Sequence, residues 1–387
     1  MKLLIVSHTP HHAVGGTIVG WGPTVREIDH LSRYFSRIVH VAPVHPGPPP
    51  PTDLPYSSNK VIVRRVRPSG GASVRDKLHA VATLPHYARI ILEEIKQADC
   101  VHVRCPASIA LIALGVLFLH ARPRPRWAKY AGNWGPLEDE PLSYRLQRWI
   151  LSHRMHRGPV TVNGSEVDQA HHVVSMANPC LTDPELAEAR SLSVQRQAFP
   201  PVQLLFVGRV EAAKGVGRAL DIVALLAQQG VDLELHIVGD GPQRPGFEVR
   251  ARRLGLQVFF HGWASRPQLA HHYARAHFLL LPTTTSEGWP KVLGEAMAFG
   301  AVPLASAISS IGDVLPRLGA GIALPPRDPQ AFVRVILEFL ERPDRWMEMS
   351  NAGMAAADEF TYEVYLQTLA RMFQTYWRVT LPADENR

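Results

Sequence analysis

The chain has 387 residues, which at roughly 100–200 residues per domain suggests two domains. Hydrophobic residues make up 46% of the sequence and charged residues 19%, which excludes a disordered chain or a coiled coil. The net charge of +7 is modest for a protein that binds nucleic acid. Three scattered cysteines, Cys100, Cys105 and Cys180, are too few for a disulfide framework or a zinc site and indicate a reducing compartment.

The charge is divided unevenly along the chain. Residues 1–180 hold 21 Lys and Arg against 12 Asp and Glu, which gives +9, whereas residues 181–387 hold 20 against 22, which gives −2. The basic half includes Arg64, Arg65 and Arg67. It is either a solvated basic surface or one that attracts an anionic membrane or acceptor. No basic strip with interleaved aromatic residues accompanies it, so we expect no nucleic-acid partner.

The apolar runs are too short for targeting or membrane segments. Residues 3–6 cannot form the core of a signal peptide, and the longest run, residues 107–119, falls short of the roughly 20 residues that span a bilayer. We therefore expect a cytoplasmic protein, with any membrane contact peripheral and at the inner face.

Short β-rich runs alternate with helical patterns along the whole chain. This alternation predicts the α/β fold class, with doubly wound parallel sheets covered by helices on both faces. The predicted strands are 3–6, 38–41, 61–66, 101–103, 127–130, 160–162, 173–175, 204–207, 233–238, 258–260, 278–281, 302–304 and 322–324. We predict one domain over residues 1–180 and a second over 181–361, followed by a final helix over 362–378 that could pack on either.

The segment 286–300 is the most informative part of the second half. Glu287 precedes a predicted helix, and Glu295 lies eight positions further on, inside it. Pro290 suits the first turn of that helix, whose free N–H groups would point beyond the strand 278–281, where α/β sheets bind ligands. A carboxylate can accept two hydroxyl donors and so suits a sugar diol. One solvated carboxylate and one on the helix surface are the alternative.

A second element follows the first strand of the second half. Gly208 ends that strand, and Arg209 and Lys214 would lie at the same sheet edge. A forked guanidinium and an ammonium group together suit a diphosphate, although two solvated loop cations are the alternative. Gly239, after the next strand, leaves another strand end open to a nucleotide.

Together these residues resemble the retaining glycosyltransferases of GT-B family 4, the glycosyl transferases group 1. The resemblance rests on the Glu-x7-Glu pattern of Glu287 and Glu295 and on the Gly-Arg…Lys-Gly element that begins at Gly208. It implies two facing Rossmann-like domains with a cleft between them. The C-terminal domain would bind a nucleotide-sugar donor and the N-terminal domain the acceptor. It also implies that the final helix, about residues 362–387, packs back on the N-terminal domain.

The resemblance also implies roles for individual residues. Arg209 and Lys214 would hold the departing diphosphate without a metal ion or a cofactor, and they form the predicted catalytic set with Glu287. Glu287 would contact the donor sugar, and Glu295 would hold the ribose. The other predicted donor contacts are Gly16, Gly208, Gly239, Gly288, Trp289, Pro290 and Lys291.

The sequence indicates the residues that would bind the acceptor less clearly than those that would bind the donor. The predicted residues are His11, His12, Asn133 and Trp134. The first two lie in a loop, residues 11–16, that matches the family's glycine-rich turn after the first strand. Many relatives carry a histidine where this sequence has Ala131, so we expect no histidine base there.

The predicted function is therefore retaining, metal-independent transfer of a hexose from a nucleotide sugar to a glycan or lipid-linked acceptor, in cell-envelope or extracellular polysaccharide synthesis. Two alternatives stay open. One is another enzyme of the same fold, such as a sugar-nucleotide epimerase. The other is a non-catalytic protein that binds a sugar nucleotide or an anionic lipid.

Overall fold

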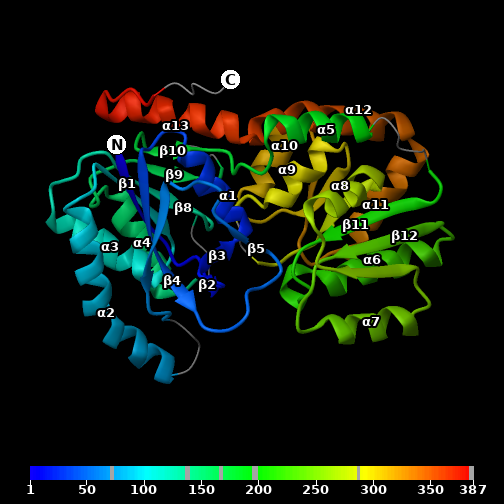
Figure 1. The fold of residues 1–387 in the computed structure, drawn as a ribbon. Helices are drawn as coiled ribbons and strands as arrows, with labels where there is room; N and C mark the ends of the chain where they lie inside the picture. Colours follow the sequence, from blue (N-terminus) through cyan, green and yellow to red (C-terminus); the bar gives the residue numbers. More distant parts are fainter. Residues whose placement is uncertain (70–73, 136–139, 165–168, 194–198, 286–287, 383–387) are drawn as a thin grey trace. The chain divides into compact units, whose positions relative to one another are not determined.

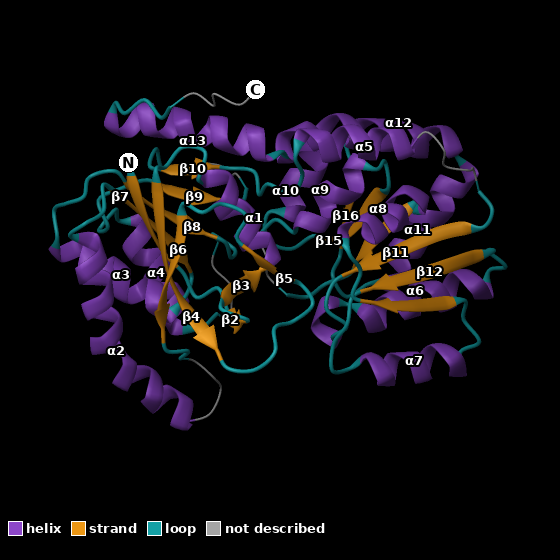
Figure 2. Cartoon of the chain, in the orientation of Figure 1, coloured by secondary structure: helices purple, strands orange, loops and turns teal. Residues whose placement is uncertain are grey.

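The computed structural model describes residues 1–69, 74–135, 140–164, 169–193, 199–285 and 288–382. The chain divides into two compact units. Unit 1 contains Met1–Asn163, Val167–Met176 and Tyr365–Arg387, and unit 2 contains Gly164–Glu166 and Ala177–Val364. Figure 1 colours the chain along the sequence, and Figure 2 marks its helices and strands.

Unit 1 is built on seven parallel strands. Their spatial order is β6-β4-β1-β7-β8-β9-β10. The strands are β1 (Lys2–Val6), β4 (Arg37–His45), β6 (Val61–Val66), β7 (Cys100–Cys105), β8 (Arg126–Tyr130), β9 (Val160–Val162) and β10 (Val173–Ser175). Three short strands, β2 (His11–Val14), β3 (Thr17–Trp21) and β5 (Asp53–Pro55), extend the sheet beyond β4.

Helices cover both faces of this sheet (Figure 1). They are α1 (Gly22–Leu31), α2 (Val74–Ile95), α3 (Ser108–Leu119), α4 (Leu142–Ser152) and α13 (Tyr362–Trp377). In β1, Leu4 and Val6 pack into the core with α2 and α3, while Leu3 and Ile5 pack with α1 and α13. Because alternate residues of the strand pack on opposite faces, the whole strand is an unbroken apolar run.

Unit 2 contains a six-stranded parallel sheet. Its strands are β11 (Val202–Val207), β12 (Leu233–Val238), β13 (Val258–Gly262), β14 (Phe278–Leu281), β15 (Val302–Ser306) and β16 (Ile322–Leu324). The spatial order β13-β12-β11-β14-β15-β16 is the 3-2-1-4-5-6 order of the dinucleotide-binding fold. The order reverses between β11 and β14, so this is the point where such a sheet leaves room for a ligand.

The helices of unit 2 also form two layers. One face is covered by α6 (Val216–Gln228), α7 (Arg244–Arg253), α11 (Pro329–Glu341) and part of α12 (Pro343–Ala356). The other carries α5 (Asp183–Ser193), α8 (Arg266–Arg275), α9 (Lys291–Ala298) and α10 (Ile311–Leu318). Two short 3-10 turns, η1 (Ala212–Lys214) and η2 (Ala357–Phe360), complete the unit.

The predicted α/β class with parallel sheets is confirmed, and every predicted strand is present in the structure. The prediction of a loop over residues 11–16 is wrong. Residues 11–14 form β2, which pairs with β3 in an antiparallel hairpin. The hairpin turns at Gly15 and Gly16, whose φ angles are 55° and 85°, because a two-residue turn of this kind needs two left-handed residues.

The final helix contributes to the core of unit 1. Leu366, Leu369 and Phe373 of α13 are buried there, and the ring of Phe373 lies 5.4 Å from that of Trp127. Within the described ranges, no helix combines the length and the apolar content that a membrane crossing requires.

Candidate active site

The loops that follow β11 and β14 are hydrogen-bonded to each other. The N–H of Thr284 donates to the carbonyl oxygen of Ala213 at 3.0 Å, and the hydroxyl groups of Thr283 and Thr284 donate to the same oxygen at 3.3 Å. Arg218 adds to this junction, since its guanidinium donates to the carbonyl oxygens of Ala213 and Pro282. We call these two loops, residues 208–215 and 282–285, the switch-point junction.

Glycines let the backbone come close at this junction. Gly215 has φ 97°, and a Cβ on it would lie 2.2 Å from the carbonyl oxygen of Pro282. Gly239, at the end of β12, has φ 130°, and a Cβ there would lie 2.0 Å from the carbonyl oxygen of Gly208. Both positions therefore exclude any other residue unless the loops move apart. The predicted donor residues Gly208 and Gly239 are thus neighbours at one strand edge.

The two predicted diphosphate ligands lie in the first loop of the junction. Lys214 is the last residue of η1 and is half-buried. The Arg209 side chain is 62% exposed, and its Nη2 lies 2.6 Å from Oε1 of Glu211. A diphosphate at this loop would have to draw the guanidinium away from Glu211. Neither Glu211 nor Arg218 was predicted from the sequence, although Arg218 follows Lys214 at the i+4 spacing of one helical face.

The turn before α9 is the second part of the candidate site. The helix begins at Lys291, with Pro290 as the residue before it, so it starts later than the sequence suggested. Gly288 has φ 62°, which gives the turn a left-handed residue. Glu287, the predicted contact of the donor sugar, lies outside the described residues.

Trp289 and Lys291 are held by other parts of unit 2. The Trp289 ring is 2% exposed and stacks on Phe360, with the ring centroids 5.1 Å apart. A donor contact of Trp289 is therefore restricted to its backbone while this packing is intact. The ammonium group of Lys291 donates to the carbonyl oxygen of Pro179 and lies 5.6 Å from the centre of the Tyr362 ring.

Glu295 is buried on α9 and is bound on both oxygens. Its Oε2 accepts a hydrogen bond from the hydroxyl of Tyr273 at 2.9 Å, and its Oε1 accepts one from Nη1 of Arg266 at 3.1 Å. Burial lowers the pKa of Arg266, but the carboxylates of Glu295 and Glu185 outweigh it and raise this pKa above its ordinary value. A ribose hydroxyl bound by Glu295 would have to share the carboxylate with these partners.

The predicted acceptor-side histidines are held inside unit 1. The Nδ1 of His11 lies 2.9 Å from the carbonyl oxygen of Thr9, and its Nε2 lies 2.9 Å from the hydroxyl of Tyr56. Burial lowers the pKa of His11, which favours the neutral form of the ring. The Nδ1 of His12 lies 2.9 Å from Oδ2 of Asp53. Gly16 lies at the tip of the same hairpin, with open space around its α-carbon.

Asn133 and Trp134 follow β8 and are partly buried. The side-chain amide of Asn133 donates to the carbonyl oxygen of Gly135 at 3.1 Å. Trp134 lies edge-on to Tyr130, with ring centroids 5.4 Å apart. Ala131, at the position of the family histidine, donates its backbone N–H to the carbonyl oxygen of Cys105.

A buried ion-pair cluster in unit 1 was not expected from the sequence. Glu27 of α1 is 1% exposed and accepts hydrogen bonds from Arg104 at 2.7 Å and from Lys129 at 3.0 Å. The hydroxyl of Tyr365 donates to the same carboxylate at 3.3 Å. These four residues lie far apart in the sequence, so no local pattern predicts them.

Three histidines of unit 2 could hold a metal ion. The ligand atoms of His236, His261 and His272 lie within 4.8 Å of one another. Burial is the main cause that lowers the pKa of each ring, and for His272 it contributes to a value of about 4. These residues lie on β12, β13 and α8, and no metal site was predicted there from the sequence.

Residues 194–355 match the family described as glycosyl transferases group 1. This part of the chain, less than half of its length, is therefore similar to the glycosyl transferases group 1. The matched region contains both loops of the switch-point junction and the turn before α9. It ends before α13, so unit 1 lies largely outside the match.

Curated proteins of similar sequence are named as glycosyltransferases. A 2-deoxystreptamine glucosyltransferase of Streptomyces kanamyceticus is 28% identical over 236 residues, which are 57% of this chain and 60% of the relative. The chain spans about half the length of the curated relatives it matches.

Solved structures have the same fold over nearly the whole chain. A sucrose-phosphate synthase from Thermosynechococcus elongatus has a TM-score of 0.70 at 19% identity, and the match covers 97% of this chain and 99% of that one. Anabaena HepE in complex with UDP-glucose has a TM-score of 0.68 at 16% identity, with 97% and 100% covered. These similarities establish the GT-B fold.

Proposed function

We propose that this chain is a glycosyltransferase that takes a sugar from a nucleoside-diphosphate sugar. The observation that carries the proposal is the switch-point junction, where two loops are hydrogen-bonded to each other at the reversal of a 3-2-1-4-5-6 sheet. The junction contains Arg209 and Lys214. The match of residues 194–355 to the glycosyl transferases group 1 supports the same function.

We assign the donor diphosphate to the loop of residues 208–215. When the bond between the sugar and the diphosphate breaks, negative charge grows on the phosphate oxygens. Lys214 stabilises that charge, and Arg209 does so once its guanidinium is released from Glu211. Breaking that ion pair takes part of the stabilisation that Arg209 supplies. In this proposal the two cations take the part that a metal ion plays in other transferases.

The carboxylates keep their predicted roles. We propose that Glu287 binds hydroxyl groups of the donor sugar and that Glu295 binds the ribose. We further propose that transfer retains the anomeric configuration through an oxocarbenium-like state.

The acceptor is proposed to be a glycan or a lipid-linked glycan bound by unit 1, with His11, His12, Asn133 and Trp134 as candidate contacts. The supporting observation is the charge of +9 over residues 1–180. A basic surface concentrates an anionic acceptor and also favours peripheral binding to an anionic membrane at its cytoplasmic face. We place the reaction in cell-envelope or extracellular polysaccharide synthesis.

The test is a panel of nucleotide sugars that starts with UDP-glucose, because HepE has been solved with it. A donor that binds the folded chain raises its unfolding temperature, and the stabilisation grows with the logarithm of 1 + [donor]/Kd. The same donor should then be hydrolysed slowly, with release of nucleoside diphosphate. Binding without release would favour the non-catalytic alternative, and no binding across the panel would contradict the proposal.

A further inference from the structure

A pocket lies in unit 1, at the end of the sheet opposite to the ligand-binding strand ends. Its volume is about 250 Å³. Arg126, the first residue of β8, lines it, and so does Pro159, which directly precedes β9. The pocket therefore lies at the amino ends of two parallel strands, whereas ligands of such sheets bind beyond the carboxyl ends.

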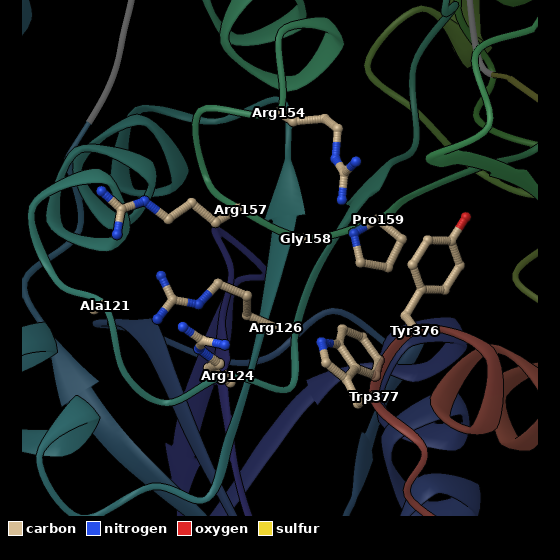
Figure 3. A pocket seen from close by; sticks show the side chains of 9 residues that line it. All are labelled: Ala121, Arg124, Arg126, Arg154, Arg157, Gly158, Pro159, Tyr376 and Trp377. Atoms are coloured by element: carbon tan, nitrogen blue, oxygen red, sulfur yellow. The ribbon is translucent and has the colours of Figure 1, made fainter.

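The walls of this pocket are strongly cationic. They carry Arg124, Arg126, Arg154 and Arg157, together with the aromatic rings of Tyr376 and Trp377 from α13. Figure 3 shows the guanidinium groups of Arg124, Arg126 and Arg157 gathered together, with the two rings across from them. None of the four arginines has a carboxylate partner among the residues that the structure describes.

Arg126 is a buried cation with an unused donor. It is 1% exposed, its Nε donates to Pro123, and its Nη1 donates to the carbonyl oxygens of Leu117 and His120. Its Nη2 is buried and has no acceptor in the described part of the chain. Burial, with the neighbouring cations of Arg157 and Arg124, lowers the pKa of Arg126 to about 10. A buried donor without an acceptor is costly, and the exposed cations of Arg124 and Arg157 add charge repulsion to the buried guanidinium of Arg126.

The loop between α4 and β9 has two arginines in an unusual backbone conformation. Arg154 and Arg157 have φ angles of 54° and 62°, a left-handed conformation that costs free energy for residues other than glycine. Gly158 lets this loop press on β8, because a Cβ there would lie 1.9 Å from the carbonyl oxygen of Arg126. Tyr376 donates from its hydroxyl to the carbonyl oxygen of His171, which fixes the aromatic wall.

We propose that this pocket binds a phosphate monoester or inorganic phosphate, at a site separate from the proposed donor site. A dianionic phosphate offers several acceptor oxygens to forked guanidinium groups and cancels the repulsion among them. The phosphate could belong to a free metabolite or to a phosphomonoester lipid headgroup. Both sources present the same chemistry to the arginines.

The test uses the double variant Arg154→Gly and Arg157→Gly. It removes two cations, and glycine tolerates the left-handed backbone at both positions. Inorganic phosphate should raise the unfolding temperature of the wild-type chain. The dissociation constant for phosphate should rise about tenfold or more in the double variant, because each charge-assisted hydrogen bond is strong. A second variant, Arg124→Ala, changes an exposed side chain and serves if the double variant does not fold.

The matched control is Arg65→Ala with Arg67→Ala, which removes two exposed cations elsewhere in unit 1. Phosphatidylcholine vesicles with and without phosphatidic acid separate the two sources. Pocket-dependent binding to phosphatidic acid supports the headgroup, and pocket-dependent binding of phosphate alone supports a metabolite. The proposal would be overturned if neither inorganic phosphate nor phosphatidic acid vesicles bound, or if the control variant lost as much affinity as the double variant.

Discussion

The α-carbon of Gly215 faces the carbonyl oxygen of Pro282 so closely that a Cβ would lie 2.2 Å from that oxygen. Two loops more than 60 residues apart in sequence therefore meet through bare backbone at the reversal of the unit 2 sheet. The loop after β11 carries both cations of the proposed donor site. The contact of Gly215 with Pro282 holds the loop that carries these cations, so we expect Gly215 to affect donor binding through the position of the loop.

Gly215→Ala should separate the two loops. We expect a loss of stability of roughly 1–3 kcal/mol and weaker donor binding, since the backbone at φ 97° and the contact with Pro282 are both violated. Urea unfolding measures the stability. Gly230→Ala is the control, because Gly230 also has a positive φ, 76°, but open space around its α-carbon. Equal losses in the two variants would show that the contact with Pro282 does not matter.

Glu295→Gln should destabilise unit 2. The substitution keeps the shape of the side chain but removes the charge that accepts from Arg266 and Tyr273, and hydrogen bonds to a charged group contribute about 1.5–3 kcal/mol. Glu338→Gln is a matched control at an exposed ion pair with Arg345, where the change should be within about 0.5 kcal/mol. Unchanged stability in Glu295→Gln would contradict the structural role.

The ribose role of Glu295 has its own test. A nucleoside diphosphate that binds the wild-type chain should bind more weakly when its 2′- or 3′-hydroxyl is removed. In Glu295→Gln this difference should shrink, because the carboxylate that binds the hydroxyl has gone. If the loss of affinity for the deoxy analogues is as large in the variant as in the wild type, Glu295 does not bind the ribose. Its role is then only to hold α8 against α9 through Arg266 and Tyr273.

Acid should destabilise unit 1 through His156. Burial lowers the pKa of this fully buried ring to about 4, against about 6.5 in an unfolded chain. Well above pH 6.5 the ring is neutral in both the folded and the unfolded chain, so protonation of His156 does not reduce the free energy of unfolding there. As the pH falls from 6.5 to 4, the unfolded chain gains a proton that the folded chain does not bind, so stability falls by up to about 3 kcal/mol.

The comparison of wild type with His156→Gln isolates that contribution. Urea unfolding at several pH values should give a shallower loss between pH 6.5 and 4 in the variant. His86→Gln, at an exposed ring, provides the control. Identical slopes for wild type and His156→Gln would remove His156 as a source of the acid sensitivity.

The strands could be predicted well because the sheets are parallel and buried on both faces. An unbroken apolar run as short as that of β14, bounded by polar residues and proline, is typical of a buried parallel strand. The hairpin of β2 and β3 was missed because its strands are short and the first begins with two histidines. His11 is nevertheless buried, since its ring finds hydrogen-bond partners in Thr9 and Tyr56, and the latter lies 45 residues away.

The roles predicted for the residues of the candidate site stay predictions, and the contacts that the structure gives those residues were mostly not foreseen from the sequence. Spacing in the sequence placed Arg209 and Lys214 in one loop after β11, but it did not reveal that Arg209 pairs with Glu211. It could not reveal that Glu295 is bound by Arg266 and Tyr273, because these residues come from another helix. Arg126 was counted only within the +9 charge of residues 1–180, which was interpreted as a basic surface. Only the fold buries that arginine beneath the loop of Arg154 and Arg157.

Turnover of the donor by Lys214→Ala tests the central claim most directly. Release of nucleoside diphosphate from the best donor of the panel should fall by about 10²–10³-fold relative to wild type, the usual cost of removing one preorganised charge-stabilising group. Arg253→Ala, at an exposed cation of unit 2, should keep the wild-type rate. Wild-type turnover in Lys214→Ala would contradict the assignment of the diphosphate to the switch-point junction.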